Sequence, residues 1–444
     1  MTDILYIHPF SQLSRSEIIP MGTIGLMNSL IGYHKIGKMY YEVNDSDILK
    51  TKIIAMDIHW YYAMHPAMQL ASHCKKLNPS IKIIVGGYTA TIFAEFILEN
   101  MEVDYVIKGD AELPFFLLVQ AIINGGDVSK IPNVCSREQK NNKIQYSISQ
   151  TDFDKLDNIS IEWFPSFKKK VVYYQSINFP AFVYPWIPIH RGCKYNCESC
   201  LGSNIYQYEL TGRYLVARSP ERVVEDFICL SDNPQIRMAY IFTDFIDVLG
   251  EEYTKIVFSR RYNLSLAYEF YNLPELSILE RFTECFPESI LIFTTMQNHT
   301  EIPRYFDLPK LEKAFKFLKR RNCRIRLLVT LNSLRKIKDR TYINNILYLR
   351  QKYSFDIYPF EDLFPPVPKP DTDRGKLFIQ YRYFFEKGSK EKMFNFIRRH
   401  MLMFVTKCAP IMLQLIENLQ TRYTIFLFQF HSLIGKIIAI FKHK

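Results

Sequence analysis

Glycine, internal repeats and a secretory leader are the features that this sequence has least of. Only 16 of its 444 residues are glycine, which leaves few positions for glycine-rich loops. The opening residues, MTDILYIHPF, contain neither the basic segment nor the long apolar stretch of a secretory signal, so we expect a cytoplasmic protein. No internal repeat is found, which excludes a repeat architecture. Because 48% of the residues are apolar, a chain of this length is expected to form two globular domains with an appendage.

The cysteines lack the spacing of a disulfide framework. Of the nine, those that stand singly are expected to be thiols packed as small hydrophobes: Cys74, Cys135, Cys229, Cys285, Cys323 and Cys408. Cys193, Cys197 and Cys200 form a C-x3-C-x2-C motif in RGCKYNCESC, with no fourth cysteine nearby. A structural zinc site closes with four protein ligands, whereas a cubane cluster can be held by three thiolates and leave one iron open. The motif therefore favours an iron–sulfur cluster, and zinc with a distant ligand such as His190 stays open as an alternative.

The first part of the chain predicts a doubly wound, Rossmann-like parallel α/β sheet. The runs DILYIHPF, TKIIAMDIHW, IKIIVGG and DYVIKGD predict strands, and PAMQLASHCKKL and TIFAEFILEN predict helices between them. Ligands of such sheets bind at the carboxyl ends of the strands. The polar and glycine residues expected there are Asp57, His59, Gly86, Gly87, Thr89, Gly109, Asp110 and Glu112.

A second series of strands predicts a partial (β/α)6 barrel of the TIM type. Its six runs are WIPIHRGC, MAYIFTDF, LSLAYEFY, SILIFTTM, RIRLLVTL and SFDIYPF. In such barrels chemistry takes place at the carboxyl ends of the strands, and Cys193 directly follows the first run. Two intervening helices are well marked: SPERVVEDFICL has Ser219 as its expected cap, and LPKLEKAFKFLKRRNC places apolar residues on one face. These apolar residues are Leu311, Ala314, Phe315 and Leu318.

The C-terminal region is basic and aromatic. Residues 371–444 hold 13 Lys or Arg against 5 Asp or Glu, a net of +8 within the chain's +11. Helices packed on the barrel with solvated basic faces would account for this pattern, and so would a surface resting on anionic lipid, which would make the protein peripheral at the membrane. Nucleic acid is disfavoured because the charges stand among bulky aliphatic residues. The run YTIFLFQFHSLIGKIIAIF at 423–441 is marginal as a membrane span.

The cysteine motif, in the setting HRGCKYNCESC, ARSPERVVEDF and YIFTDF, resembles radical S-adenosylmethionine (SAM) enzymes. The segments DIHWYYAMHPAMQLASHCKKLNPSIKIIVGGYTATIF and VDYVIKGDAELP are similar to the N-terminal cobalamin-binding-type domain of one subgroup. With the breaker PPVPKP at 365–370, the resemblance implies four parts. They are a cobalamin-binding-like domain (1–130), a linker (131–185), a radical SAM partial barrel (186–364) and a helical appendage (365–444).

The resemblance also implies cofactors and site residues. Cys193, Cys197 and Cys200 would bind three irons of a 4Fe-4S cluster, and SAM would chelate the fourth. Contacts to SAM would come from Thr243, Asp244, Glu269 and Gln297, and contacts to cobalamin from His59, Gly86, Gly87, Thr89, Gly109 and Glu112. The usual lower-ligand motif for cobalamin, Asp-x-His-x-x-Gly, is absent: His8 and His59 both stand outside it. Strand-end capping and ordinary packing would also account for these polar residues, and the sequence identifies no catalytic residue beyond them.

The function implied is cleavage of SAM at the cluster to release a deoxyadenosyl radical, which functionalises an unactivated carbon, with cobalamin-dependent methyl transfer as the reaction class. A flavodoxin or ferredoxin would be the reductant, and the substrate a small molecule or a lipid. Two alternatives stay open: a radical SAM enzyme acting on a lipid without cobalamin, and a catalytically degenerate iron–sulfur or corrinoid-binding protein. The second is motivated by Gln297, where a carboxylate is expected, and by the absence of a glycine-rich turn in LLVTLNSL.

Overall fold

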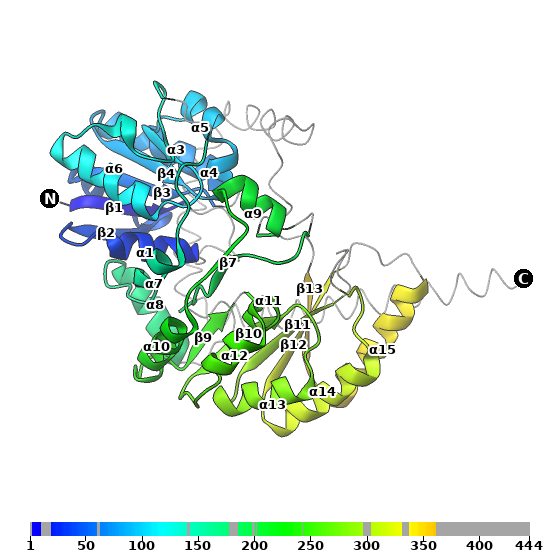
Figure 1. Ribbon diagram of the computed structural model, residues 1–444. Helices are drawn as coiled ribbons and strands as arrows, with labels where there is room; N and C mark the ends of the chain where they lie inside the picture. Colours follow the sequence, from blue (N-terminus) through cyan, green and yellow to red (C-terminus); the bar gives the residue numbers. More distant parts are fainter. Residues whose placement is uncertain are drawn as a thin grey trace, which may run out of the picture.

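Two parallel sheets, each covered by helices, form the framework of the chain (Figure 1). The computed structural model describes residues 2–9, 19–59, 63–139, 143–176, 185–197, 200, 202–241, 243–295, 303–330 and 337–360. The first sheet has the order β2-β1-β3-β4-β5-β6, and only β6 is antiparallel to its neighbour. Its strands are β1 (Thr2–His8), β2 (Lys35–Met39), β3 (Thr51–Asp57), β4 (Lys82–Gly86), β5 (Tyr105–Ile107) and β6 (Val134–Cys135).

Short helices alternate with these strands and continue into the connection to the second sheet. They are α1 (Met21–Ser29), η2 (Tyr40–Glu42), α2 (Asp45–Leu49), α3 (Met64–Leu77), α4 (Tyr88–Ile92), α5 (Ala94–Asn100), α6 (Glu112–Asn124), η4 (Val128–Lys130), α7 (Gln150–Lys155) and α8 (Pro165–Ser176). In the first sheet, β2 is added on one side of β1, and β3 and the later strands are added on its other side, so the strand order reverses between β1 and β3. This switch point is where doubly wound sheets bind their ligands.

The second sheet has five parallel strands in the order β13-β12-β11-β10-β9. These strands are β9 (Met238–Ile241), β10 (Ser265–Phe270), β11 (Ile290–Thr295), β12 (Arg324–Thr330) and β13 (Asp356–Phe360). A separate antiparallel pair, β7 (His190–Gly192) and β8 (Leu215–Ala217), precedes them. The helices are α9 (Asn204–Thr211), α10 (Pro220–Ser231), α11 (Phe245–Leu249), α12 (Glu251–Val257), α13 (Leu276–Cys285), α14 (Leu308–Arg320) and α15 (Ile337–Tyr353).

One apolar core is shared by the two sheets. From the first sheet it includes Ile4 and Tyr6, and from the second Tyr240 and Ile292. Between them lie aromatic residues of the connection, including Phe164, which is fully buried. β9 and β11 are buried at every residue. This is expected of parallel strands that are covered on both faces, and it explains why their sequences are largely apolar. The other face of each sheet has its own core against helices.

The connection also completes one side of the second sheet. The side-chain amide of Gln175, on α8, donates to the Met238 carbonyl at 2.7 Å and accepts from the Met238 amide at 3.1 Å. The segment before β7 lies along the same strand, since Tyr240 N donates to the Pro185 carbonyl and Ile187 N to the Tyr240 carbonyl. Residues 185–187 therefore run beside β9, with one bridge between Trp186 and Tyr240.

Most of the predicted elements are confirmed, and the mixed α/β class with parallel sheets is confirmed with them. Ser219 accepts a hydrogen bond from the Arg222 amide at 3.3 Å as the cap of α10. All four apolar residues predicted on one face of α14 are buried. The structure differs from the prediction in several details. The strands β2, β6 and β8 were not predicted, and TIFAEFILEN forms two short helices rather than one. The first predicted barrel strand, WIPIHRGC, leaves β9 after its single bridge and ends in β7, which pairs with β8.

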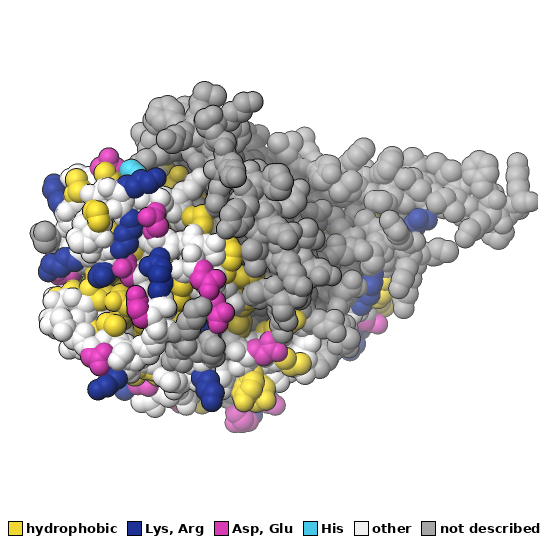
Figure 2. Space-filling model, turned by 90° about the horizontal axis from the view of Figure 1, so that it is seen from above, with side chains coloured by type: hydrophobic (Ala, Val, Ile, Leu, Met, Phe, Trp, Pro, Cys, Tyr) yellow, Lys and Arg dark blue, Asp and Glu magenta, His cyan; other side chains and the backbone are white. Residues whose placement is uncertain are grey.

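The bounds of the four predicted parts stay predictions, and the C-terminal region from residue 361 lies outside the described residues. Among the helices that the structure describes, none is long and apolar enough to cross a membrane. Figure 2 shows acidic and basic side chains interspersed on the described part of one face, without a patch of a single sign.

Removing Phe164 is expected to destabilise both sheets together. Its ring packs against Tyr6, Trp163 and Phe167 in the shared core, with centroids 5.4–6.0 Å apart. Phe164→Ala should lower the free energy of unfolding by ~3–5 kcal/mol, measured by urea denaturation followed by circular dichroism. Ile31→Ala, at a side chain that is 84% exposed, is the control and should change it by less than about 0.5 kcal/mol. Equal effects of the two variants would contradict the role of the shared core.

Candidate functional site

The three cysteines of the motif lie on one loop between β7 and α9. Cys193 is half-buried, Cys197 buried and Cys200 exposed. The loop is held by its own backbone, because the Cys200 amide donates to the Cys197 carbonyl at 3.1 Å and the Asn204 amide to the Tyr195 carbonyl at 2.9 Å. Burial raises the pKa of the Cys193 thiol, so we expect binding of a soft metal here to release a proton.

The loop begins with a glycine that no other residue can replace without strain. Gly192 has a φ of +81°, which residues with side chains rarely adopt, and a Cβ there would overlap the carbonyl oxygen of Tyr214, just before β8. The direction in which the chain leaves β7 is thus fixed at the residue before Cys193.

One side of the loop is fastened to the second sheet. The Tyr195 hydroxyl donates to Asp247 Oδ2 at 2.6 Å, and Lys194 Nζ lies 3.1 Å from Asp247 Oδ1. Asn272, just after β10, donates to both Asp247 and the Tyr195 hydroxyl, at 3.0 and 2.9 Å. These contacts position the loop over the carboxyl ends of β9 and β10.

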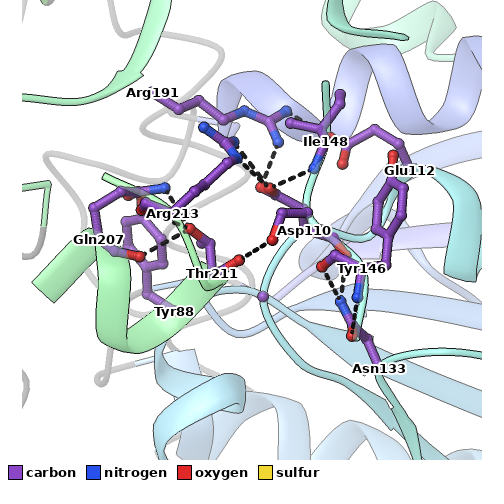
Figure 3. Close-up of polar contacts among 12 residues, drawn as sticks. Tyr88, Asp110, Glu112, Asn133, Tyr146, Ile148, Arg191, Gln207, Thr211 and Arg213 are labelled. Atoms are coloured by element: carbon purple, nitrogen blue, oxygen red, sulfur yellow. Dashed lines mark hydrogen bonds and ion pairs between the residues drawn. The ribbon is translucent and has the colours of Figure 1, made fainter. Parts of the chain in front are cut away.

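The other side is fastened to the first sheet by four buried charges (Figure 3). Arg191 donates to Asp110 Oδ1 at 2.9 Å and to Glu112 Oε1 at 2.5 Å. Arg213 donates to Asp110 Oδ2 at 2.8 Å, and the Ile148 amide donates to the same oxygen at 3.0 Å. The four side chains are 4–17% exposed. Within the described residues, Glu112 Oε2 and Arg213 Nη1 are buried without a hydrogen-bond partner.

Tyr88 connects the first sheet to α9 beside this network. Its hydroxyl donates to Gln207 Oε1 on α9 at 3.1 Å, and its ring lies 4.8 Å from the His59 ring. Burial raises the pKa of Tyr88 to about 12, with a smaller contribution from the charge at Cys200. Tyr88 therefore lies between the strand ends of the first sheet and the cysteine loop.

A second polar cluster occupies the switch point between β1 and β3. Asp57 Oδ1 accepts from the Tyr6 hydroxyl at 2.5 Å and pairs with His8 Nδ1 at 2.8 Å. Among the described residues, Asp57 Oδ2 is buried and has no hydrogen-bond partner. Burial lowers the pKa of the adjacent His59 to about 4, so His59 is neutral at physiological pH.

The glycines and threonine predicted to contact cobalamin shape the neighbouring turns. Gly87 has a φ of +105°, and a Cβ there would lie 2.8 Å from the His59 backbone. Thr89 is fully buried and donates to the His59 carbonyl at 3.0 Å. A Cβ on Gly109 would lie 2.9 Å from the Leu210 carbonyl, so this turn touches α9. By contrast, a Cβ on Gly86 would meet nothing closer than 3.7 Å.

Glu269 and Tyr271 bring the end of β10 to the cysteines. Burial, with the charges of Glu269, Cys193 and Cys200, raises the pKa of Tyr271. Thr294 donates to Glu269 Oε1 at 2.7 Å, and burial raises the pKa of Glu269 to about 7. Burial raises the pKa of the Cys200 thiol, and of the described residues predicted to contact SAM, Glu269 lies near enough for its charge to raise that pKa further.

Asp244 has a different environment from Glu269. It caps α11 by accepting from the Asp247 amide at 3.2 Å, and it also accepts from the Tyr268 hydroxyl at 2.7 Å and the Tyr271 amide at 2.9 Å. These three hydrogen bonds are local, and a contact of Asp244 with SAM stays a prediction. Thr243 forms the preceding turn, with its carbonyl accepting from the Phe245 amide at 2.9 Å. Gln297 lies outside the described residues.

A site for a single metal ion is absent from the described residues. No three His, Cys, Asp or Glu side chains there lie close enough together to hold one. His190, the alternative zinc ligand, contacts the Gly192 carbonyl at 2.8 Å through Nδ1, and its Nε2 is buried without a partner among the described residues. In a cubane cluster each protein ligand binds a different iron, so the thiols need not converge on one point.

Sequence reasoning missed the residues that hold the loop in place. Arg191 stands inside the quoted motif, but only the cysteines of that motif carry a recognisable ligand spacing. Arg213, Tyr88 and Asp247 carry no local pattern, because their partners are 52–119 residues away in the sequence. The sequence offered one signal for these contacts: Arg191, beside the cysteines, could have been matched with Asp110 and Glu112, the two carboxylates of the Gly-Asp-x-Glu segment.

No family model matches this chain. Among curated proteins it is 28% identical over 170 residues to an uncharacterized methyltransferase of Pyrococcus horikoshii, which is 38% of this chain and 34% of that protein. It is 23% identical over 188 residues to the hopanoid C-3 methylase of Methylococcus capsulatus, covering 41% of this chain and 33% of the methylase. The matches thus span about a third of the length of these relatives.

Solved structures share the fold over most of the chain. The radical SAM methyltransferase TsrM from Kitasatospora setae, with cobalamin and a [4Fe-4S] cluster bound, matches with a TM-score of 0.60 at 12% identity, over 84% of this chain and 74% of TsrM. The cobalamin-dependent SAM radical enzyme OxsB, with aqua-cobalamin bound, matches with a TM-score of 0.55 at 11% identity, over 87% of this chain and 56% of OxsB. The resemblance to radical SAM enzymes with an N-terminal cobalamin-binding-type domain is confirmed.

The buried carboxyl of Asp244 predicts a pH-dependent stability. Burial raises its pKa to about 7 from the ordinary 3.8, so the folded chain retains a proton that the unfolded chain loses. Its contribution to stability is complete below the unfolded pKa and is lost as the pH rises through about 7. Relative to Asp244→Asn, the wild type should lose about 2–3 kcal/mol of unfolding free energy between about pH 5 and about pH 8. Urea denaturation across this range measures it, and a pH-independent difference would contradict the burial of a protonated carboxyl.

Proposed function

We propose that this chain is a cobalamin-dependent radical SAM enzyme of the methyltransferase class, with the partial barrel and helical appendage predicted from its sequence. The observation that carries the proposal is the position of the C-x3-C-x2-C loop. It follows the segment that runs beside β9, and it meets the carboxyl ends of the first sheet through Arg191 and Tyr88. In the same fold, TsrM binds a [4Fe-4S] cluster and cobalamin.

The donor set of the loop fits an iron–sulfur cluster. Three thiols from one short loop are soft ligands, and they leave one iron open for SAM. Cys193, Cys197 and Cys200 would hold the cluster, and Glu269 and Tyr271, both half-buried at the end of β10, would line the site beside it. When bound, the cluster and cobalamin supply one-electron chemistry on SAM and methyl transfer to an unreactive carbon.

The switch point of the first sheet fits a corrin with amide side chains. A Cβ on Gly86 would make only an ordinary van der Waals contact, 3.7 Å from the Ile107 carbonyl, and without a side chain Gly86 would permit close approach of a flat ligand. Asp57 Oδ2, buried and without a partner among the described residues, would accept a hydrogen bond from an amide N–H of the ligand. His59 is neutral, so it would add no charge to the site.

The proposed substrate is a small molecule or a lipid. A small molecule is favoured by TsrM, which was solved with its tryptophan substrate, and a lipid by the similarity to a hopanoid methylase. A flavodoxin or ferredoxin is the proposed reductant. A catalytically degenerate iron–sulfur or corrinoid-binding protein is the outcome if the loaded chain binds both cofactors and never consumes SAM.

Cys197→Ala is expected to abolish cleavage of SAM, because it removes one of the three thiolates that would hold the cluster. After anaerobic reconstitution, iron, acid-labile sulfide and products of SAM should all fall to background. Cys229→Ala is the matched control, since Cys229 is an exposed thiol on α10 outside the loop. Unchanged iron and turnover in Cys197→Ala would reject the proposed cluster site.

Gly86→Ala is expected to weaken cobalamin binding without unfolding the chain. The added methyl group meets only the Ile107 carbonyl, at 3.7 Å, but it would occupy the space left for a ligand. Affinity for hydroxocobalamin, followed by its absorption spectrum, should fall by about tenfold to a hundredfold, the equivalent of ~1–3 kcal/mol of overpacking. The melting temperature should remain that of the wild type. Wild-type affinity in this variant would show that the corrin does not approach the β4–α4 turn.

A further inference from the structure

The four buried charges around Asp110 join the two halves of the candidate site. Arg191 and Arg213 come from the two segments that flank the cysteine loop and α9, whereas Asp110 and Glu112 come from the turn after β5. Two arginines face two carboxylates, so the network is electrically balanced when it is complete. Loss of one member would leave a charge buried without its partner, which is costly at this degree of burial.

The connection from Arg191 to the first cysteine is short and stiff. Gly192 is the one residue between them, and its φ of +81° leaves no space for a side chain against Tyr214. Arg191 is held further by the Phe153 ring, 4.9 Å from its guanidinium carbon. Its guanidinium also lies near the first turn of α1, where a Cβ on Gly22 would stand 3.3 Å from Arg191 Nη2. A displacement of Arg191 would therefore be transmitted to Cys193.

We infer that Arg191 is a positioning residue: its ion pairs with Asp110 and Glu112 fix the cysteine loop relative to the ligand-binding edge of the first sheet. The functional consequence of this inference rests on the proposed function: if the chain binds both cofactors, the ion pairs would set the separation between the cluster and the corrin. The contacts of Lys194 and Tyr195 with Asp247 fix the same loop to the second sheet. The loop is thus held from both sides, and the two sets of contacts have no residue in common.

The structure provides a matched control for the ion pairs. Arg218 and Asp226 form another buried pair, with side chains 0% and 3% exposed, and Arg218 lies against the same Phe153 ring. That pair joins the residue after β8 to α10, and among the described residues no hydrogen bond or ion pair connects it to the first sheet. Its loss should destabilise the chain without releasing the cysteine loop.

Hydrogen exchange of the full-length chain without iron or SAM tests the inference. The amides to follow are those of Cys200, Ser203, Asn204 and Gln207, which donate to carbonyls within the loop and at the start of α9. In Glu112→Gln, which keeps the side-chain shape and removes one charge, these amides should exchange at least about tenfold faster than in the wild type. Arg191→Lys, which keeps the charge but cannot bridge both carboxylates, should give an intermediate increase.

Amides of β11 and β12 report global opening, and in both variants they should accelerate less than the loop amides. Asp226→Asn should accelerate exchange in α10 and leave the loop amides as in the wild type. Wild-type exchange of the loop in Glu112→Gln, or equal acceleration of the loop in Glu112→Gln and Asp226→Asn, would overturn the inference. If the wild type fails to assemble an iron–sulfur cluster, the proposed function fails, but the exchange result still decides whether Arg191 positions the loop.

Discussion

The apolar core between the two sheets is the constraint on which the rest of the structure depends. Because both sheets bury one face against the same aromatic residues of the connection, neither can rotate without opening that core. Their carboxyl edges are thereby brought together, and Arg191 and Asp110, on opposite sides of the junction, come within hydrogen-bond distance. Because Arg191 and Gly192 directly precede Cys193, the cysteine loop starts at this junction.

The positions of the polar groups at the junction also depend on the packing of the two sheets. A buried charge is tolerated where partners from other elements are held in place, and the two sheets provide such partners at fixed positions. The Asp110 network uses this to fasten a loop, whereas Asp57 keeps one oxygen unused at the switch point. The first arrangement balances two positive against two negative side chains around the loop, although Glu112 Oε2 and Arg213 Nη1 have no hydrogen-bond partner among the described residues. The second leaves one oxygen of Asp57 for a ligand.

The elements of this fold could be predicted from the sequence far better than their contacts. Strands such as β9 and β11 were found because they are continuous apolar runs, and α14 because its apolar residues recur with helical spacing. The cysteine motif was found because three soft ligands crowded into one loop are typical of a metal or cluster site. The partners of Asp110 could not be predicted, because they depend on how the two sheets pack together, and the periodicity of apolar residues within a strand or helix contains no information about that packing. Asp244 and Glu269 illustrate the same limit, because strand position alone does not say whether a carboxyl caps a helix or faces a ligand.

The side chain of Gln175 has a consequence for the behaviour of the chain in concentrated solution. An outer strand with free amides and carbonyls is a template for pairing with another molecule, and β9 would be such a strand. Gln175 occupies the backbone groups at its start, and residues 185–187 occupy those that follow. The margin of the second sheet at β9 is thus sealed within the chain, which protects it against intermolecular β-aggregation.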